Sequence, residues 1–178
     1  MIAAIWLPLG TLLFLITLLT GHGYAGWDEA LKVPFSQWRD GPYYIFGYIH
    51  FALSLACSLL ILVLIFRQGH RGEILTGFCI VLLLIVVIVT PSHDVFHRYS
   101  SYVLFLMLMS YYTWVLWRWH PRYVMVHLAI LLALALLTTW HSYGFWQKTL
   151  VLYVLVLMNI QGLYLQSSIL NSNSSVTN

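Results

Sequence analysis

The stretch Ile74–Thr90, ILTGFCIVLLLIVVIVT, contains no charged residue and no proline. Its apolar side chains cover every face of a helix, whereas a surface helix of a soluble protein keeps one polar face. At about 1.5 Å per residue such a helix is about 26 Å long, close to the roughly 30 Å hydrocarbon thickness of a bilayer. The stretch therefore predicts a transmembrane helix.

The composition of the whole chain agrees with this prediction. Of its 178 residues, 61% are hydrophobic and 7% are charged, whereas about a quarter of a soluble protein is charged. This scarcity excludes a soluble enzyme, a disordered regulator and a coiled coil. A net charge of +3 is too small to form the basic patch of a nucleic-acid-binding protein, so that class is excluded as well. We expect a multi-pass integral protein of the cell membrane.

Five further stretches are as apolar as the first, and none alternates as the strands of a membrane barrel do. The chain therefore predicts an all-α bundle of six transmembrane helices. Because the first stretch lacks the positive charges that begin a signal peptide, we expect it to be retained. Residues 1–166 would form one transmembrane domain, and the polar residues 167–178 a disordered tail. The five stretches are Ile2–Thr20, Tyr43–Phe66, Tyr99–Trp117, Tyr123–Trp140 and Thr149–Leu165.

The basic residues predict the orientation of the helices. Arg67, Arg71, Arg118 and Arg122 fall in the short second and fourth links. The other three links carry as many basic residues over more than twice the length. Because cytoplasmic links concentrate Lys and Arg, we expect both termini to be cytoplasmic.

Polar residues concentrate in the links of the opposite, non-cytoplasmic face. The first of these links, Gly21–Pro42, is long and rich in aromatic residues, and we expect it to fold against the membrane surface. His50 would lie about 10 Å below the same face, seven residues into its helix. We take the candidate binding cluster to be Trp27, Asp28, Glu29, His50, His93, Asp94 and His97.

Two interpretations of the motif TPSHDVFH, residues 90–97, remain open. If a helix begins here, His93 and His97 share one face, and they could hold zinc or iron. A third ligand could come from Asp28, Glu29, His22 or His141 in the neighbouring links. Alternatively, Thr90 or Ser92 caps the helix and Asp94 favours its dipole, with no metal bound. We expect no cofactor, because two ligands at helical spacing define a site poorly.

The order of these features resembles that of the six-helix membrane proteins of the DRAM/Sfk type and their uncharacterised bacterial relatives. The resemblance in residues is carried by Tyr24–Glu29 (YAGWDE), Val33–Ser36 (VPFS) and Ser92–His97 (SHDVFH). It implies six helices, cytoplasmic termini and a role in membrane or lipid organisation, and it carries over no catalytic residue. A fainter resemblance links the chain to the zinc hydrolases of the alkaline-ceramidase superfamily. Those have seven helices and a second histidine pair, which Thr149–Leu165 lacks.

Three functions follow as hypotheses. In the first, the protein has no catalytic activity and binds lipid headgroups or a partner membrane protein through its non-cytoplasmic links. In the second, it is a structural subunit of a larger membrane complex. In the third, it is a metal-dependent membrane hydrolase centred on His93, Asp94 and His97. Nucleophilic hydrolysis is the other enzymatic option, in which Ser54 would face His97 and Asp94 as a triad, although other serines are equally available.

Overall fold

The computed structural model describes residues 2–26, 32–42, 44–69, 71–137 and 143–174. Within these ranges the protein is entirely helical, as predicted. The described part contains six long helices and two short ones. They are α1 (Ile2–Ala25), α3 (Phe35–Asp40), α4 (Tyr44–Gln68), α5 (Arg71–Val89), α6 (Val95–Trp119), the 3-10 turn η1 (Pro121–Tyr123), α7 (Val124–Leu137) and α8 (Tyr143–Ser174).

Within the described residues, each of the six apolar stretches corresponds to one long helix, because an uncharged run satisfies its backbone polar groups most simply as a helix. Four described segments are long and apolar enough to cross a membrane: Ile5–Gly23, Tyr44–Gln68, Arg71–Val89 and Gly144–Ile169. Helix α8 runs to Ser174, so the helix continues into the polar segment where we expected a tail.

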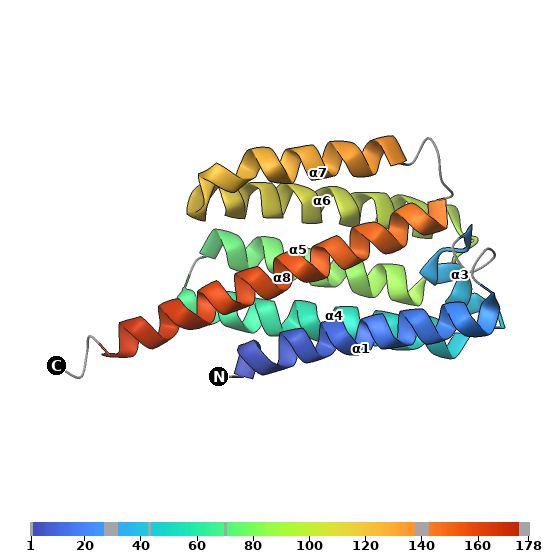
Figure 1. Ribbon diagram of the computed structural model, residues 1–178, viewed down its shortest axis with the longest axis horizontal. Coiled ribbons are helices and arrows are strands. Elements are labelled where there is room, and N and C mark those ends of the chain that lie inside the picture. Colours follow the sequence, from blue (N-terminus) through green and yellow to red (C-terminus); the bar gives the residue numbers. More distant parts are fainter. Residues whose placement is uncertain (1, 27–31, 43, 70, 138–142, 175–178) are drawn as a thin grey trace.

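The long helices lie side by side, and the two termini lie at the same end of the bundle (Figure 1). Consecutive long helices are in contact and run in opposite directions (Figure 1). Helix α8 crosses the bundle and packs against both α1 and α4, which are distant in sequence. We call the end that carries the termini the terminal end, and the opposite end, where α3 lies, the α3 end.

Hydrogen bonds between helices recur on threonine hydroxyl groups. The hydroxyls of Thr17, Thr90 and Thr113 each donate to a carbonyl of the preceding turn and contact a histidine ring nitrogen at 3.0–3.2 Å. Each hydroxyl can donate one hydrogen bond and accept others, so it can serve the carbonyl and the histidine nitrogen together. The three histidines are His50, His97 and His127. The pair Thr17–His50 joins α1 to α4, and Thr113–His127 joins α6 to α7. The pair Thr90–His97 joins α6 to the link that follows α5.

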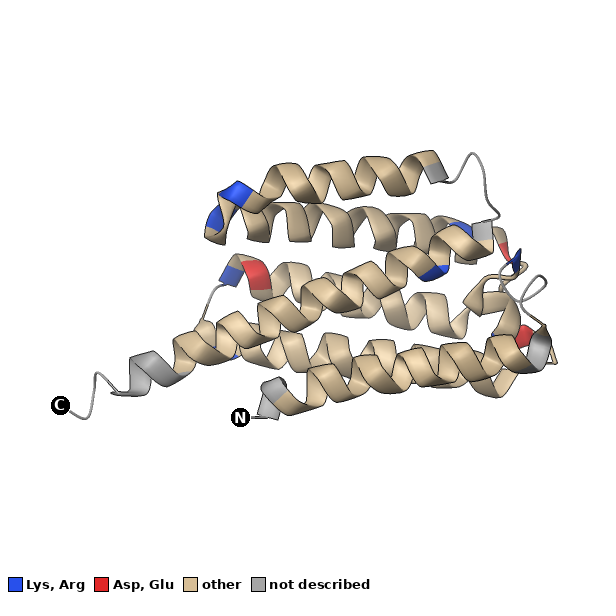
Figure 2. Cartoon of the chain, viewed as in Figure 1, with Lys and Arg blue, Asp and Glu red and all other residues tan. Residues whose placement is uncertain are grey.

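Charged residues gather toward the two ends of the bundle, and the middle of the helices between them carries none (Figure 2). Large apolar side chains are instead exposed along the outside of the bundle, among them Val63 on α4, Leu106 on α6 and Leu132 on α7. An outer surface of this kind suits contact with lipid tails.

Candidate functional site at the α3 end

Helix α3 is a short helix inserted between the ends of longer ones. It begins after Pro34, whose carbonyl accepts from the N–H groups of Gln37 and Trp38. Glycines on its neighbours make room for it: a Cβ on Gly21 would lie 2.7 Å from the Trp38 ring, and one on Gly47 would collide with the Arg39 backbone. The described part of the link is therefore packed into the end of the bundle along α3.

The indole of Trp38 fills the space under α3. Trp38 is fully buried, and its ring meets the His22 and His50 rings with centroids 5.2 and 5.8 Å away. The buried ammonium of Lys148, from α8, lies 4.4 Å from the centroid of the Trp38 ring. A desolvated cation over an indole face is a favourable arrangement. Trp38 thereby joins α1, α4 and α8 at this end.

Arg39 caps the carboxyl end of α5. Its buried guanidinium donates to the carbonyl oxygens of Val87, Ile88 and Thr90, at 3.2 Å to Val87 and 2.7 Å to Thr90. The last carbonyls of a helix have no partner within the helix, so Arg39 supplies hydrogen-bond donors to acceptors at this end.

Asp40 extends this network to the link between α5 and α6. Its carboxylate accepts from Arg39 at 2.6 and 3.0 Å and from the Ser92 N–H at 2.7 Å. The Arg39 guanidinium, with the Ser92 N–H, holds the pKa of this carboxyl well below its usual range. A depressed pKa means that the stabilisation is present at neutral pH and is lost as the pH falls through that low value.

The predicted site residues of the α5–α6 link separate in the structure. Helix α6 begins at Val95, and the Asp94 side chain caps it by accepting from the Phe96 N–H at 2.8 Å. The sequence had suggested Thr90 or Ser92 as the cap, but neither of them caps the helix. His93 precedes the helix and is exposed, whereas His97 is buried with its Nδ1 3.2 Å from the Thr90 hydroxyl. The proposed i, i+4 pair on one helix face is therefore wrong.

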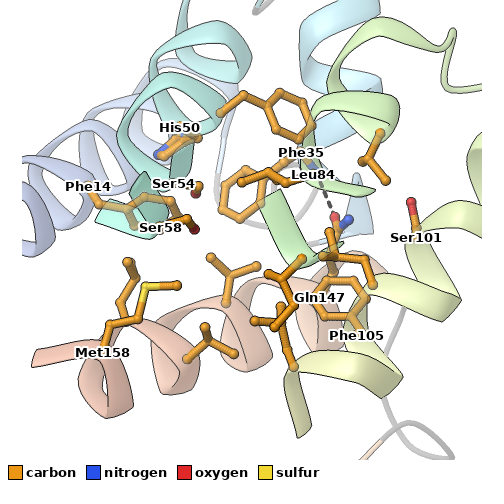
Figure 3. A pocket seen from close by; sticks show the side chains of 18 residues that line it. Phe14, Phe35, His50, Ser54, Ser58, Leu84, Ser101, Phe105, Gln147 and Met158 are labelled. Carbon is orange, nitrogen blue, oxygen red and sulfur yellow. Dashed lines mark hydrogen bonds between the residues drawn. The ribbon is translucent and has the colours of Figure 1, made fainter. Parts of the chain in front are cut away.

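His50 lies deeper, as its position in the sequence predicted, and borders a buried cavity of about 70 Å³ (Figure 3). Its Nε2 is 3.1 Å from the Thr17 hydroxyl. Ser54 and Ser58 follow on the same side of α4 and also line the cavity, whose walls are otherwise mostly aliphatic and aromatic. Gln147 of α8 lies at the cavity and accepts from the Phe35 N–H at 2.9 Å.

This arrangement does not assemble the nucleophilic triad considered from the sequence. Ser54 lines the cavity with His50, but His97 and Asp94 are not among the lining residues. Nor does any group of three or more His, Cys, Asp and Glu side chains in the described ranges lie close enough to hold a metal ion. Trp27, Asp28 and Glu29 lie outside the described residues.

Sequence reasoning missed the residues that organise this end. Arg39 and Lys148 had been counted only as charges of the non-cytoplasmic links, yet both are buried. The sequence indicated their burial only through their position, because each lies within a few residues of an uncharged helix. A basic residue there is either exposed to headgroups or paired inside the protein, and only the packing distinguishes the two.

One group of exposed side chains at the α3 end lies around the start of α6. His93 and Arg98 are exposed, and so are Val95, Phe96 and Tyr99 beside them. Arg98 makes no ion pair with any described residue, unlike Arg39. No protein-family model, curated protein or solved structure matches the chain.

Proposed function

We propose that this chain is a multi-pass protein of the cell membrane with six spans and cytoplasmic termini, and that it binds phospholipid headgroups at its α3 end. The observation that carries the proposal is the exposed pair His93 and Arg98, set among exposed aromatic and apolar side chains at the start of α6. The resemblance to DRAM/Sfk-type proteins favours the same role in lipid organisation.

Six spans require that α6 and α7 also cross the membrane, although neither is among the four candidate spans of sufficient length and hydropathy. Their exposed apolar surface supports this. Helix α6 has 25 residues, about 37 Å, and α7 has 14, about 21 Å. Both expose apolar side chains outward: Val103 and Leu106 on α6, and Met125, Leu132 and Leu136 on α7. Such surfaces are stable in lipid and costly in water.

The orientation is supported by the arginines of the terminal end. Arg67, Arg71, Arg118 and Arg122 lie in or beside the two short links there, with Glu73 as the acidic residue of those links. In the sequence, the other three links and the helix ends beside them carry four basic and four acidic residues, so the two charges balance there. Positive charge is retained on the cytoplasmic side, so the α3 end faces away from the cytoplasm.

The headgroup site is argued from the face of α6 that begins at Val95. Residues three, four and seven positions further along a helix share a face, which places Val95, Arg98, Tyr99 and Tyr102 together. Tyr99 and Val95 are 65% and 63% exposed. Exposed apolar surface of this kind is unfavourable in water and is suited to the lipid interface. The Arg98 guanidinium at that depth meets the phosphate of a phospholipid, and the exposed His93 lies one turn nearer the headgroup layer.

The test is a lipid titration of the purified protein in mild detergent, with phosphatidylethanolamine as the probe and bound lipids counted by native mass spectrometry. We expect the double variant His93→Ala/Arg98→Gln to bind the first lipid about fivefold more weakly, because about 1 kcal/mol of phosphate attraction is lost with the arginine. Lys32→Gln removes one exposed positive charge from the same end and should leave the affinity unchanged.

Equal affinities in the double variant and the wild type would contradict the headgroup proposal. Turnover of the lipid during the titration would point instead to the hydrolase alternative. A membrane protein that co-purifies at fixed stoichiometry with the wild type, and is lost from the variant, would favour the partner or complex alternative.

A further inference from the structure

A groove opens between α4 and α5 at the terminal end, on the outside of the bundle. It has a volume of about 650 Å³ and runs along the last two turns of α4 and the first two turns of α5. Its apolar lining includes Leu62 and Phe66 from α4 and Ile74 and Phe78 from α5. Phe66 and Phe78 are 69% and 51% exposed, so the groove faces the lipid rather than the protein core.

The two helices converge at the inner limit of this groove. A Cβ on Gly77 of α5 would lie 3.0 Å from a methyl group of Leu62, so the helices are in close contact at that level. Towards their link they leave a furrow that side chains do not fill. The distance along α5 from Arg71 to Phe78 is about 10 Å, which corresponds to the upper part of one acyl chain.

Arg67 and Arg71 stand at the open end of the groove and complete its lining. Both are exposed, and neither side chain makes an ion pair or hydrogen bond with a described residue. The other two arginines of this end are engaged within the protein. Arg118 lies 3.9 Å from Glu73 and over the Trp114 ring, and Arg122 lies over the Tyr123 ring at 4.8 Å.

We infer that this groove binds an anionic glycerophospholipid, with the phosphate between Arg67 and Arg71 and one acyl chain along the apolar floor. Two uncompensated cations above a furrow without acidic residues are complementary to that amphiphile. A free phosphate ion would leave the apolar floor unoccupied, and a zwitterionic lipid would bring its own cation to the arginines. Basic pockets between helices are a known mode of binding for anionic lipids.

This site goes beyond the proposed function, because it lies at the other end of the bundle and shares no residue with the α6 headgroup site. It requires only that the helices be embedded in lipid. Each site can therefore fail without the other.

The test uses the full chain in mild detergent, titrated with phosphatidylglycerol and separately with phosphatidylcholine, and native mass spectrometry measures the first binding constant. We expect Arg67→Gln/Arg71→Gln to weaken phosphatidylglycerol binding about 30-fold, since each arginine near a phosphate contributes about fivefold. Binding of phosphatidylcholine should change less than twofold, and inorganic phosphate at millimolar concentration should not compete.

Two variants separate the groove from general charge. Arg122→Gln removes a positive charge from the same end but away from the groove, and it should leave phosphatidylglycerol binding within twofold of the wild type. Ile74→Trp fills the groove while both arginines remain, and it should weaken phosphatidylglycerol binding about tenfold. All the groove side chains to be changed are at least partly exposed, so folding is preserved, which circular dichroism checks.

The inference is overturned if Arg122→Gln weakens binding as much as removal of one groove arginine does, because the lipid would then respond to net charge alone. It is also overturned if the groove variants bind phosphatidylglycerol normally. Conversion of a wild-type dimer to a monomer by Ile74→Trp would overturn it too, since a second copy of the chain would then be the occupant.

Discussion

Replacing Arg39 by methionine should lower the free energy of unfolding by about 3–5 kcal/mol. The carbonyl oxygens of Val87, Ile88 and Thr90 at the end of α5 would lose their donor, and each unsatisfied buried polar group costs about 1–3 kcal/mol. The Asp40 carboxylate would lose its ion pair as well. The measurement is an unfolding titration with sodium dodecyl sulfate in mixed micelles, followed by circular dichroism.

Arg98→Met is the matched control, because Arg98 is exposed at the same end and pairs with no described residue. Arg98→Met should change the free energy of unfolding by less than about 0.5 kcal/mol. The loss of unfolding free energy in Arg39→Lys should lie between the losses in Arg39→Met and Arg98→Met. One ammonium cannot reach all the acceptors that the planar guanidinium does. If Arg39→Met and Arg98→Met were equally stable, the capping of α5 by Arg39 would be refuted.

Replacing Trp38 by alanine should lower the free energy of unfolding by a similar amount, about 3–5 kcal/mol. The indole is fully buried and contacts rings from α1, α3 and α4 and the ammonium of Lys148. Its removal leaves a cavity where four elements meet, and the glycines that admit α3 supply no side chains to fill it. The same unfolding titration measures the loss, and Trp38→Phe should recover part of it.

Trp117→Ala provides the comparison for this variant. Trp117 is 68% exposed on α6, so its truncation removes lipid contacts and creates no internal cavity. We expect a loss below about 1 kcal/mol. A loss as large as that of Trp38→Ala would mean that tryptophan truncation destabilises this protein wherever it occurs, and α3 would have no special part in holding the bundle together.

The helices of this fold could be predicted from the sequence because the signal is uniform and local. An uncharged run such as Ile74–Thr90 must satisfy its own backbone in lipid, and a helix does so with no information from elsewhere in the chain. The two polar ends are different. The six residues of α3, FSQWRD, are too few to show a periodicity, and they become a helix by packing against Gly21 and Gly47.

The site was harder to predict because burial at a helix end depends on tertiary packing. His93 and His97 are equivalent in a helical pattern, but a start at Val95 leaves one exposed and the other bonded to Thr90. The candidate ligands were selected for their chemistry, whereas Thr90 and Thr17 owe their role to the neighbouring helix. Arg39 carried no signal of its function, because its acceptors lie about 50 residues further along the chain.

In the proposed orientation, the bundle crosses the membrane with its α3 end outside the cell and its terminal end in the cytoplasm. Single cysteines test this directly, after the two native free cysteines, Cys57 and Cys79, have been replaced by alanine. A membrane-impermeant maleimide applied to intact cells should label His93→Cys at the α3 end. It should label Arg122→Cys at the terminal end only after the membrane is permeabilised. Labelling of both positions in intact cells, or of Arg122→Cys alone, would contradict the account.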